Sequence, residues 1–144
     1  MCGLAGIMVA TPSVAADALH AQARAMGDAL RHRGPDDAGV WVDAAAGIAL
    51  AHRRLSILDL SPLGHQPMAS SDGRYVLAYN GEIYNFAALR TELEPWGHVF
   101  QGHSDTEVLL AAGLEWGLED TLQRCNGMFA LALWDRQEQC LWLA

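Results

Sequence analysis

The spacing of apolar residues changes along the chain and predicts strands and helices in turn. Leu4 to Val9 is an apolar run that ends at Thr11-Pro12, as expected for a buried strand. Between Asp17 and Arg31 the apolar residues recur at steps of four, three and four, the stripe of an amphipathic helix, at Leu19, Ala23, Met26 and Leu30. The breaker pair Gly34-Pro35 ends this pattern, so we expect the helix to stop before it.

The middle of the chain reads as extended segments joined by loops. Apolar runs over Gly39–Val42 and Ile48–His52 predict two strands, and Leu55–Leu58 continues in extended style. Two prolines and two glycines between Ser61 and Gly73 predict a loop. Tyr75–Tyr79 then predicts another buried strand.

The dipeptide Asn80-Gly81, which follows that strand, has two interpretations. It is a strong signal for a tight hairpin turn with no chemical role. It also places a side-chain amide and a flexible glycine at a strand end, where both could bind a ligand. The two interpretations are equally supported by the dipeptide itself.

The second half of the chain predicts two helices and then two strands. Asn85–Glu94 reads as a helix with Asn85 as its N-cap, and Ser104 with Glu107 forms a capping box that opens the next helix. Met128–Trp134 and Cys140–Leu143 are apolar runs joined by a polar turn. Strands, two adjacent helices and more strands favour an α+β layered sandwich over strict βαβ alternation.

Composition narrows the class of protein. The 144 residues are 51% hydrophobic, enough for one domain with a core. A net charge of −8 argues against a nucleic-acid or anionic-membrane partner. All nine basic residues are arginines, which excludes lysine chemistry. Three cysteines without a signal sequence predict a reduced, cytoplasmic protein with no disulfide framework, and no ligand spacing predicts a metal site.

Cys2, directly behind the initiator Met1, is the first candidate for chemistry. If the methionine is removed, one residue carries both a thiol and an α-amine. That amine has an ordinary pKa near 7.7–8.0, so a fraction is neutral at pH 7 and can take the proton from the thiol. The alternative is a small buried residue at the start of a strand.

Three further residues or pairs fit attack on an amide of a free amino acid. Asn80 and Gly81 could donate two N–H groups to a developing oxyanion. Arg54 suits an α-carboxylate through its bidentate fork, and Asp105 suits an α-ammonium group. The sequence alone does not place these residues together.

Six motifs in order resemble the glutamine amidotransferase domain of the N-terminal-nucleophile type, in the branch found in glutamine-hydrolysing asparagine synthetases. They cover essentially the whole chain. The motifs are Met1-Cys2-Gly3-Leu4-Ala5-Gly6-Ile7, Arg31-His32-Arg33-Gly34-Pro35-Asp36, Ala51-His52-Arg53-Arg54-Leu55-Ser56-Ile57, Tyr79-Asn80-Gly81-Glu82-Ile83-Tyr84-Asn85, Ser104-Asp105-Thr106-Glu107 and Asn126-Gly127-Met128-Phe129-Ala130.

The resemblance implies a four-layer αββα sandwich of two antiparallel sheets and a role for each site residue. Cys2 would be the nucleophile, and Asn80 with Gly81 the oxyanion hole. Arg54 would bind the α-carboxylate of glutamine, supported by the backbone around Ile57 and Leu58. Asp105 would face the ammonium group, with Glu82 beside the same polar headgroup. The products would be ammonia and, through a γ-glutamyl thioester, glutamate.

The resemblance also implies parts that these 144 residues lack. Domains of this family run longer, so we expect the sandwich to be incomplete at its C-terminal end, with exposed sheet edges. A following synthetase domain in cis would use ATP and Mg²⁺ to amidate a carboxylate, aspartate by default in asparagine biosynthesis. The glutaminase domain itself needs no cofactor.

Other possibilities stay open. They are another acceptor, a catalytically silent regulatory or interaction module of the same fold, and a cysteine hydrolase acting on another amide. A homodimer is also compatible with the sequence.

Overall fold

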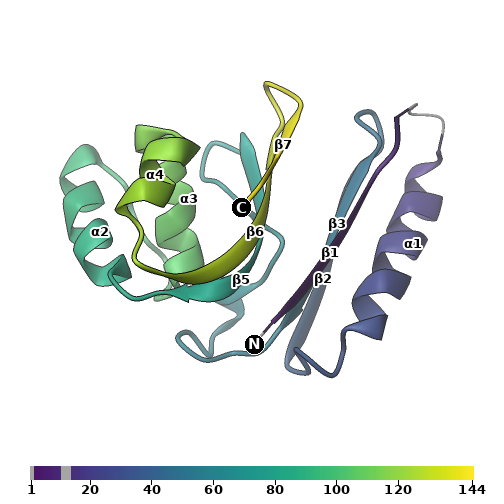
Figure 1. Cartoon of the computed structure of the whole chain (residues 1–144), viewed down its shortest axis with the longest axis horizontal. Helices are drawn as coiled ribbons and strands as arrows, with labels where there is room; N and C mark the ends of the chain where they lie inside the picture. Colours follow the sequence, from purple (N-terminus) through teal and green to yellow (C-terminus); the bar gives the residue numbers. More distant parts are fainter. Residues whose placement is uncertain (1, 11–13) are drawn as a thin grey trace.

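The computed structural model describes residues 2–10 and 14–144 and shows four layers, helix, sheet, sheet and helices (Figure 1). The first layer is one helix, α1 (Ala16–Ala29). The second is an antiparallel sheet of β1 (Gly3–Met8), β3 (Ile48–Arg54) and β2 (Asp37–Asp43), in that order. The third is an antiparallel sheet of β4 (Met68–Ala69), β5 (Tyr75–Ile83), β6 (Gly127–Asp135) and β7 (Cys140–Leu143).

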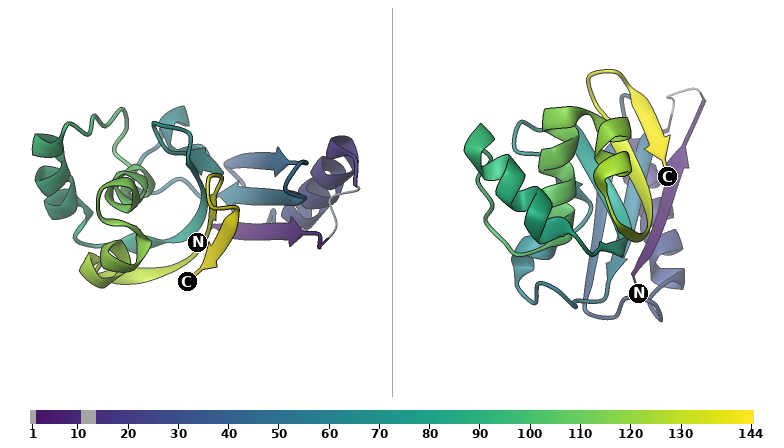
Figure 2. Two further views of the ribbon diagram at one scale, coloured as in Figure 1. Left: turned by 90° about the horizontal axis from the view of Figure 1, so that it is seen from above. Right: turned by 60° about the vertical axis from the view of Figure 1, so that its left-hand side comes forward.

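Three helices form the fourth layer, against the outer face of the second sheet (Figure 2). They are α2 (Phe86–Leu93), α3 (Asp105–Trp116) and α4 (Leu118–Arg124), and two short 3₁₀ turns lie at Pro62–Gly64 and Glu94–Trp96. This arrangement confirms the predicted αββα sandwich. Across the described ranges, no helix combines the length and apolar character needed to cross a membrane.

Strand alternation explains how both sheets are covered. On β5, Leu77 and Tyr79 face the helical layer, whereas Val76 and Ala78 face the first sheet. On β3, alternate residues face α1 and the second sheet in the same way. The two sheets pack face to face, and the side chains between them are apolar over most of the interface. The C-terminal ends of β3 and β5 carry polar residues, such as Arg54 and Asn80.

The structure corrects the interpretation of Asn80-Gly81 as a turn or a strand end. β5 runs on through both residues to Ile83, paired with β6 along its whole length. Gly81 is needed here for close approach, because a Cβ at this position would collide with the backbone oxygen of Met128 and with Phe129 on β6. The dipeptide is therefore part of a continuous strand.

The predicted and observed elements also differ in three smaller ways. The extended segment predicted over Leu55–Leu58 is a loop, and the predicted loop 61–73 contains the two-residue strand β4. Helix α4 was not predicted, because its sequence is short and mostly polar. Met1 and the predicted strand end at Thr11-Pro12 lie outside the described residues.

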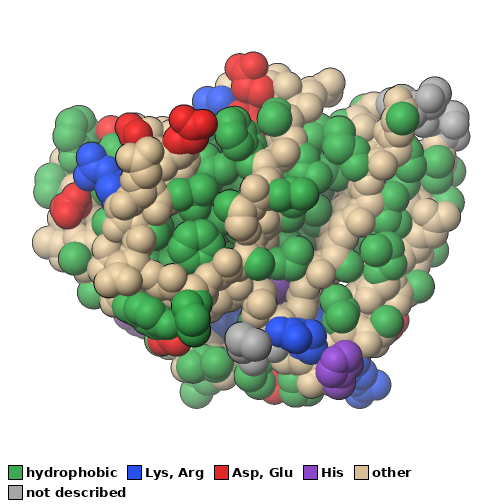
Figure 3. All heavy atoms as spheres, in the orientation of Figure 1, with side chains coloured by type: hydrophobic (Ala, Val, Ile, Leu, Met, Phe, Trp, Pro, Cys, Tyr) green, Lys and Arg blue, Asp and Glu red, His purple; other side chains and the backbone are tan. Residues whose placement is uncertain are grey.

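Both sheets end in an exposed strand on one face of the molecule. β1 and β7 are outer strands of their sheets, and apolar side chains there, such as Met8 at 55%, Trp142 at 40% and Leu143 at 73%, are exposed. In the space-filling view, hydrophobic side chains extend over both sheets on the visible face (Figure 3). Such edges can pair with further strands.

Candidate active site

All eight residues that the sequence singled out line one cavity of about 240 Å³. They come from β3, β5, α3, the loop after β3 and the residue directly before β1, and they are Cys2, Arg54, Ile57, Leu58, Asn80, Gly81, Glu82 and Asp105. Ligand pockets commonly measure about 300 to 1,000 Å³, so this cavity suits a single amino acid better than a nucleotide or a peptide.

Cys2 lies where the first sheet meets the cavity, one residue before β1. Its sulfur accepts a hydrogen bond from the Leu55 N–H at 3.3 Å and lies 3.7 Å from the Leu55 carbonyl. Arg33 donates from Nε to the Cys2 carbonyl at 2.9 Å. The loop that carries Arg33 therefore fixes the backbone of Cys2, and the thiol is held at the cavity wall.

The edge of β5 that faces away from β6 supplies backbone donors. In a β-strand, N–H groups two residues apart point to the same side. The Tyr79 N–H on this edge binds the Gln66 side chain at 2.7 Å, and the Ile83 N–H binds Asp105 at 3.0 Å. Gly81 lies between them, so its N–H points to the same side, and no acceptor takes it among the described residues. It is free to bind an oxyanion.

Asn80 projects from the opposite face of the strand to Tyr79, toward the first sheet. Its side-chain Oδ1 is buried and has no hydrogen-bond partner within the described part of the chain. The amide is therefore not held by structural hydrogen bonds and is available to a ligand in the cavity.

Arg54, at the end of β3, is 8% exposed and fixed by the loop that follows it. Nη1 donates to the Ser61 carbonyl at 2.8 Å, and Nη2 donates to the Asp59 carbonyl. A Cβ at Gly64 would occupy the space of the guanidinium, so the loop closes tightly over it. Two of the five N–H groups have structural partners, which leaves donors for a carboxylate.

Asp105 begins α3 and is 5% exposed. One oxygen, Oδ2, accepts from the Tyr79 hydroxyl at 2.8 Å and from the Ile83 N–H at 3.0 Å. No described residue donates to Oδ1. Burial first, and then the Asp105 charge, raise the pKa of Tyr79, so its hydroxyl stays protonated and remains a donor.

The loop over Arg54 is anchored to the start of α3 through Asp59. Its Oδ1 accepts from the Ser61 N–H and its Oδ2 from the His103 N–H, both at 2.8 Å. The backbone hydrogen bond from His103, followed by those from Ser61, lowers the pKa of Asp59 to about 2. This carboxylate is therefore a structural anion.

The start of α3 differs in one respect from the capping box that the sequence predicted. Ser104 accepts from the Glu107 N–H at 3.3 Å, as expected for an N-cap. The Glu107 carboxylate, however, bonds to the N–H groups of Gln101 and Gly102 instead of the Ser104 N–H. The glutamate thus orders the loop before the helix.

His52, on β3, has a structural role. It is 1% exposed, and its Nε2 lies 2.9 Å from the Tyr79 carbonyl. Burial lowers the pKa of His52 to about 4, so the ring is neutral at pH 7 and Nε2 carries the proton that the carbonyl accepts. Cys125 is half-buried, and burial raises the pKa of its thiol.

Sequence reasoning missed Gln66 and Tyr79 as site residues. Both line the cavity, and both are tied to the backbone or to Asp105. Gln66 lies in a segment read as an undifferentiated loop, and Tyr79 read as a buried strand residue.

Among the described residues, no cluster of three or more His, Cys, Asp or Glu side chains could hold a metal ion.

Comparison with known proteins identifies the class. Residues 1–144 match the family model described as a glutamine amidotransferase domain. The chain belongs to this family, as its motifs predicted.

Its relatives define the branch. A putative asparagine synthetase [glutamine-hydrolyzing] of Mycobacterium tuberculosis is 46% identical over 94% of this chain and 22% of its own length. Asparagine synthetase B [glutamine-hydrolyzing] of Escherichia coli is 42% identical over 96% of this chain and 24% of its own length. The chain therefore spans about a fifth to a quarter of the length of these relatives.

A solved structure supports the fold independently. The glutamine phosphoribosylpyrophosphate amidotransferase of Bacillus subtilis, complexed with ADP and GMP, superposes with a TM-score of 0.63. The match covers 75% of this chain and 31% of that protein, at 23% sequence identity. The chain thus shares the layered fold of that amidotransferase.

Proposed function

We propose that this domain hydrolyses the side-chain amide of glutamine with Cys2 as the nucleophile. The observation that supports this function best is that four groups line one cavity. They are the Cys2 thiol, the Gly81 N–H, which has no acceptor among the described residues, the Arg54 guanidinium, which is held by its loop, and the Asp105 carboxylate, which accepts structural hydrogen bonds on one oxygen. A free amino acid needs both a cation and an anion to hold its headgroup, and a thiolate needs an oxyanion donor.

The reaction would proceed in two steps. After Met1 is removed, the α-amine of Cys2 takes the thiol proton, and sulfur attacks the γ-carbonyl carbon. The oxyanion that forms accepts hydrogen bonds from the Gly81 N–H and the Asn80 amide. Collapse breaks the carbon–nitrogen bond, and the leaving group takes the proton from the amine and departs as ammonia. Water then attacks the γ-glutamyl thioester, which releases glutamate and restores the thiol.

The headgroup would be held at the other end of the cavity. The free N–H groups of Arg54 would donate to the α-carboxylate, with the backbone at Ile57 and Leu58 beside it. Oδ1 of Asp105 would accept from the α-ammonium group, and Glu82 would lie against the same group. Charge-assisted hydrogen bonds of this kind are roughly twice as strong as neutral ones.

The ammonia would serve a second reaction outside these residues. By similarity to the asparagine synthetases, a following domain would bind ATP and Mg²⁺ and amidate aspartate. The glutaminase domain itself would need neither. The complete cavity supports the enzyme over the silent module that the sequence left open.

Intact mass spectrometry with a diazo-ketone analogue of glutamine tests this proposal. We expect loss of Met1 and one adduct on Cys2, and we expect excess glutamine to prevent the adduct. Labelling at Cys125 or Cys140, or a retained methionine, would count against it. The matched control is Cys125→Ala, which removes a half-buried thiol outside the cavity lining and should leave labelling unchanged.

Kinetics give a second test. Cys2→Ala in the full-length protein should abolish glutamine hydrolysis but leave the use of free ammonia intact. Loss of both activities together would contradict the division of labour between the two domains.

A further inference from the structure

The edge of β5 loses its strand partner just before the cavity. β4 pairs with β5 only at Val76 and Leu77. Tyr79 comes next on this edge, and both its N–H and its C=O point away from β6, because the two groups of one residue face the same side of an antiparallel strand. With no strand beside it, Tyr79 needs other partners for two buried backbone groups.

Two side chains take the place of the missing strand. The Tyr79 N–H donates to Oε1 of Gln66 at 2.7 Å, and the Tyr79 carbonyl accepts from Nε2 of His52 at 2.9 Å. His52 belongs to β3 of the first sheet, and Gln66 to the loop before β4. The backbone at Tyr79 is thus fixed from two separate parts of the fold.

Gln66 also connects this edge to the residue expected to bind the ammonium group. It is 5% exposed, and its Nε2 donates to the Thr106 hydroxyl at 3.3 Å, in the first turn of α3 beside Asp105. The Tyr79 hydroxyl reaches Asp105 directly. One buried amide therefore joins the strand that carries Gly81 to the helix that carries Asp105.

We propose that Gln66 and His52 are positioning residues that hold the β5 edge in the geometry of an oxyanion hole. The inference rests on the proposed function. The Tyr79 carbonyl belongs to the peptide unit that joins Tyr79 to Asn80, and the Gly81 N–H follows on the same edge. Since neither Gln66 nor His52 needs to touch the oxyanion, their effect passes through the backbone of Tyr79.

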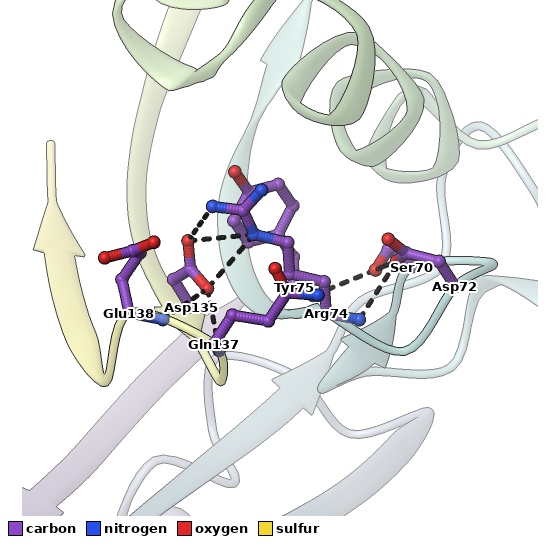
Figure 4. A network of polar contacts seen from close by, with 7 residues as sticks. All are labelled: Ser70, Asp72, Arg74, Tyr75, Asp135, Gln137 and Glu138. Atoms are coloured by element: carbon purple, nitrogen blue, oxygen red, sulfur yellow. Dashed lines mark hydrogen bonds and ion pairs between the residues drawn. The ribbon is translucent and has the colours of Figure 1, made fainter.

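Ser70 provides a matched control at the other end of the same strand. Its hydroxyl accepts from the Tyr75 N–H at 2.9 Å, so it too is a buried side chain that satisfies an N–H on this edge (Figure 4). Ser70 lies outside the cavity lining. Ser70→Ala removes the same kind of bond without disturbing the Gly81 N–H.

The decisive variant is Gln66→Met, which keeps the length of the side chain and removes both hydrogen bonds. Misplacement of an oxyanion donor lowers turnover, so we expect kcat for glutamine hydrolysis to fall about 10- to 100-fold, with KM within about threefold. Ser70→Ala should leave both constants within about twofold of the unaltered protein. Both variants are measured in the full-length protein.

Ligand binding separates positioning from general loss of structure. The γ-aldehyde analogue of glutamine forms a hemithioacetal with Cys2 whose oxygen occupies the oxyanion position, whereas glutamate forms no such adduct. In Gln66→Met, the affinity for the aldehyde should fall by about the same factor as kcat, and the affinity for glutamate should change less than threefold. Thr106→Val, which only removes the acceptor of the Gln66 N–H, should show the same pattern with a severalfold effect, and it serves if Gln66→Met does not fold.

Equal losses of aldehyde and glutamate affinity in the folded variants would overturn the positioning role while leaving the proposed function intact. An unchanged kcat in Gln66→Met would do the same. Absence of glutamine hydrolysis and of aldehyde binding in the unaltered protein would instead overturn the proposed function, and the inference with it.

Discussion

Two buried aspartates line the same cavity and use their oxygens differently. Asp59 accepts one backbone N–H on each oxygen, from Ser61 and His103. Asp105 accepts two donors on a single oxygen and has none on the other among the described residues. The two side chains are equally hidden, at 6% and 5% exposed.

The difference teaches how to separate a structural carboxylate from a binding one. Burial and backbone hydrogen bonds are common to both, so neither identifies the functional residue. The distribution of donors does, because a carboxylate oxygen that no structural group occupies, and that is not among the fully buried atoms, can accept a hydrogen bond from a ligand in the cavity. On this criterion Asp59 fixes the loop over Arg54, and Asp105 keeps one oxygen for the ammonium group that we propose it binds.

The largest effect is expected for Asp105→Asn. The amide oxygen can replace Oδ2 and keep both structural hydrogen bonds, so the fold should be retained, but the negative charge that faces the substrate is lost. We expect kcat/KM for glutamine to fall about 100-fold or more, mainly through KM. Steady-state kinetics at saturating and limiting glutamine measure this, and an unchanged KM would remove Asp105 from the headgroup site.

Asp59→Asn should lower the stability of the fold more than it lowers activity, the reverse of Asp105→Asn. Because each oxygen of Asp59 accepts an N–H, an amide must turn its own NH₂ toward either Ser61 or His103. The free energy of unfolding should drop by about 2 kcal/mol, with kcat largely retained. Urea denaturation followed by fluorescence checks the stability, and a loss of kcat as large as that of Asp105→Asn would cancel the contrast between the two residues.

The contribution of Asp59 should depend on pH in a defined direction. Its pKa is about 2 in the folded protein against an ordinary 3.8, so the ionised form stabilises the fold above pH 3.8. Between pH 3.8 and 2 the unfolded chain binds more protons, and this part of the stability is lost. The gap in unfolding free energy between the unaltered protein and Asp59→Asn should therefore narrow as pH falls through this window. A gap that stays constant would mean that the carboxylate charge is not responsible.

The smallest effect concerns the helix on which Asp105 lies. Ser104→Ala removes the N-cap hydrogen bond to the Glu107 N–H and should cost about 1 kcal/mol of stability. The Glu107 carboxylate and the Tyr79 hydroxyl still hold the first turn, so KM should change less than threefold. A tenfold change in KM without a comparable loss of stability would show that Asp105 is placed by its cap more than by its own hydrogen bonds.

Local patterns predicted an α+β layered sandwich and the chemistry of Cys2, Arg54, Asn80, Gly81 and Asp105. The order of the four layers and the assignment of Ile57, Leu58 and Glu82 to the site came from the resemblance to the family. The helical stripe that begins at Leu19 and the alternation along β5 follow from side-chain direction alone. The motifs contain every candidate except Leu58, which directly follows one of them, and the structure brings all eight candidates into one cavity. Their individual roles remain predictions until the variants are measured.

The structural features that the sequence could not predict depend on contacts between distant segments of the chain. Asn80-Gly81 is a turn signal by propensity, yet pairing with β6 keeps it extended. Gln66 had no local pattern, because its importance arises only where β4 stops and Tyr79 needs a partner. The free oxygen of Asp105 is likewise visible only once Tyr79 and Ile83 are seen to share the other one.

The division of the site between two sheets has a mechanical consequence. Cys2 is attached to the first sheet, whereas Asn80 and Gly81 belong to the second, and sheets packed face to face lie about 10 Å apart across an apolar layer. The distance from the Cys2 sulfur to the Gly81 N–H, which we propose as the oxyanion donor, therefore depends on the thickness of that layer. Side chains such as Leu50 and Val76, which do not line the cavity, act as spacers in that layer. A change in their volume should therefore alter turnover although every residue that lines the cavity stays the same.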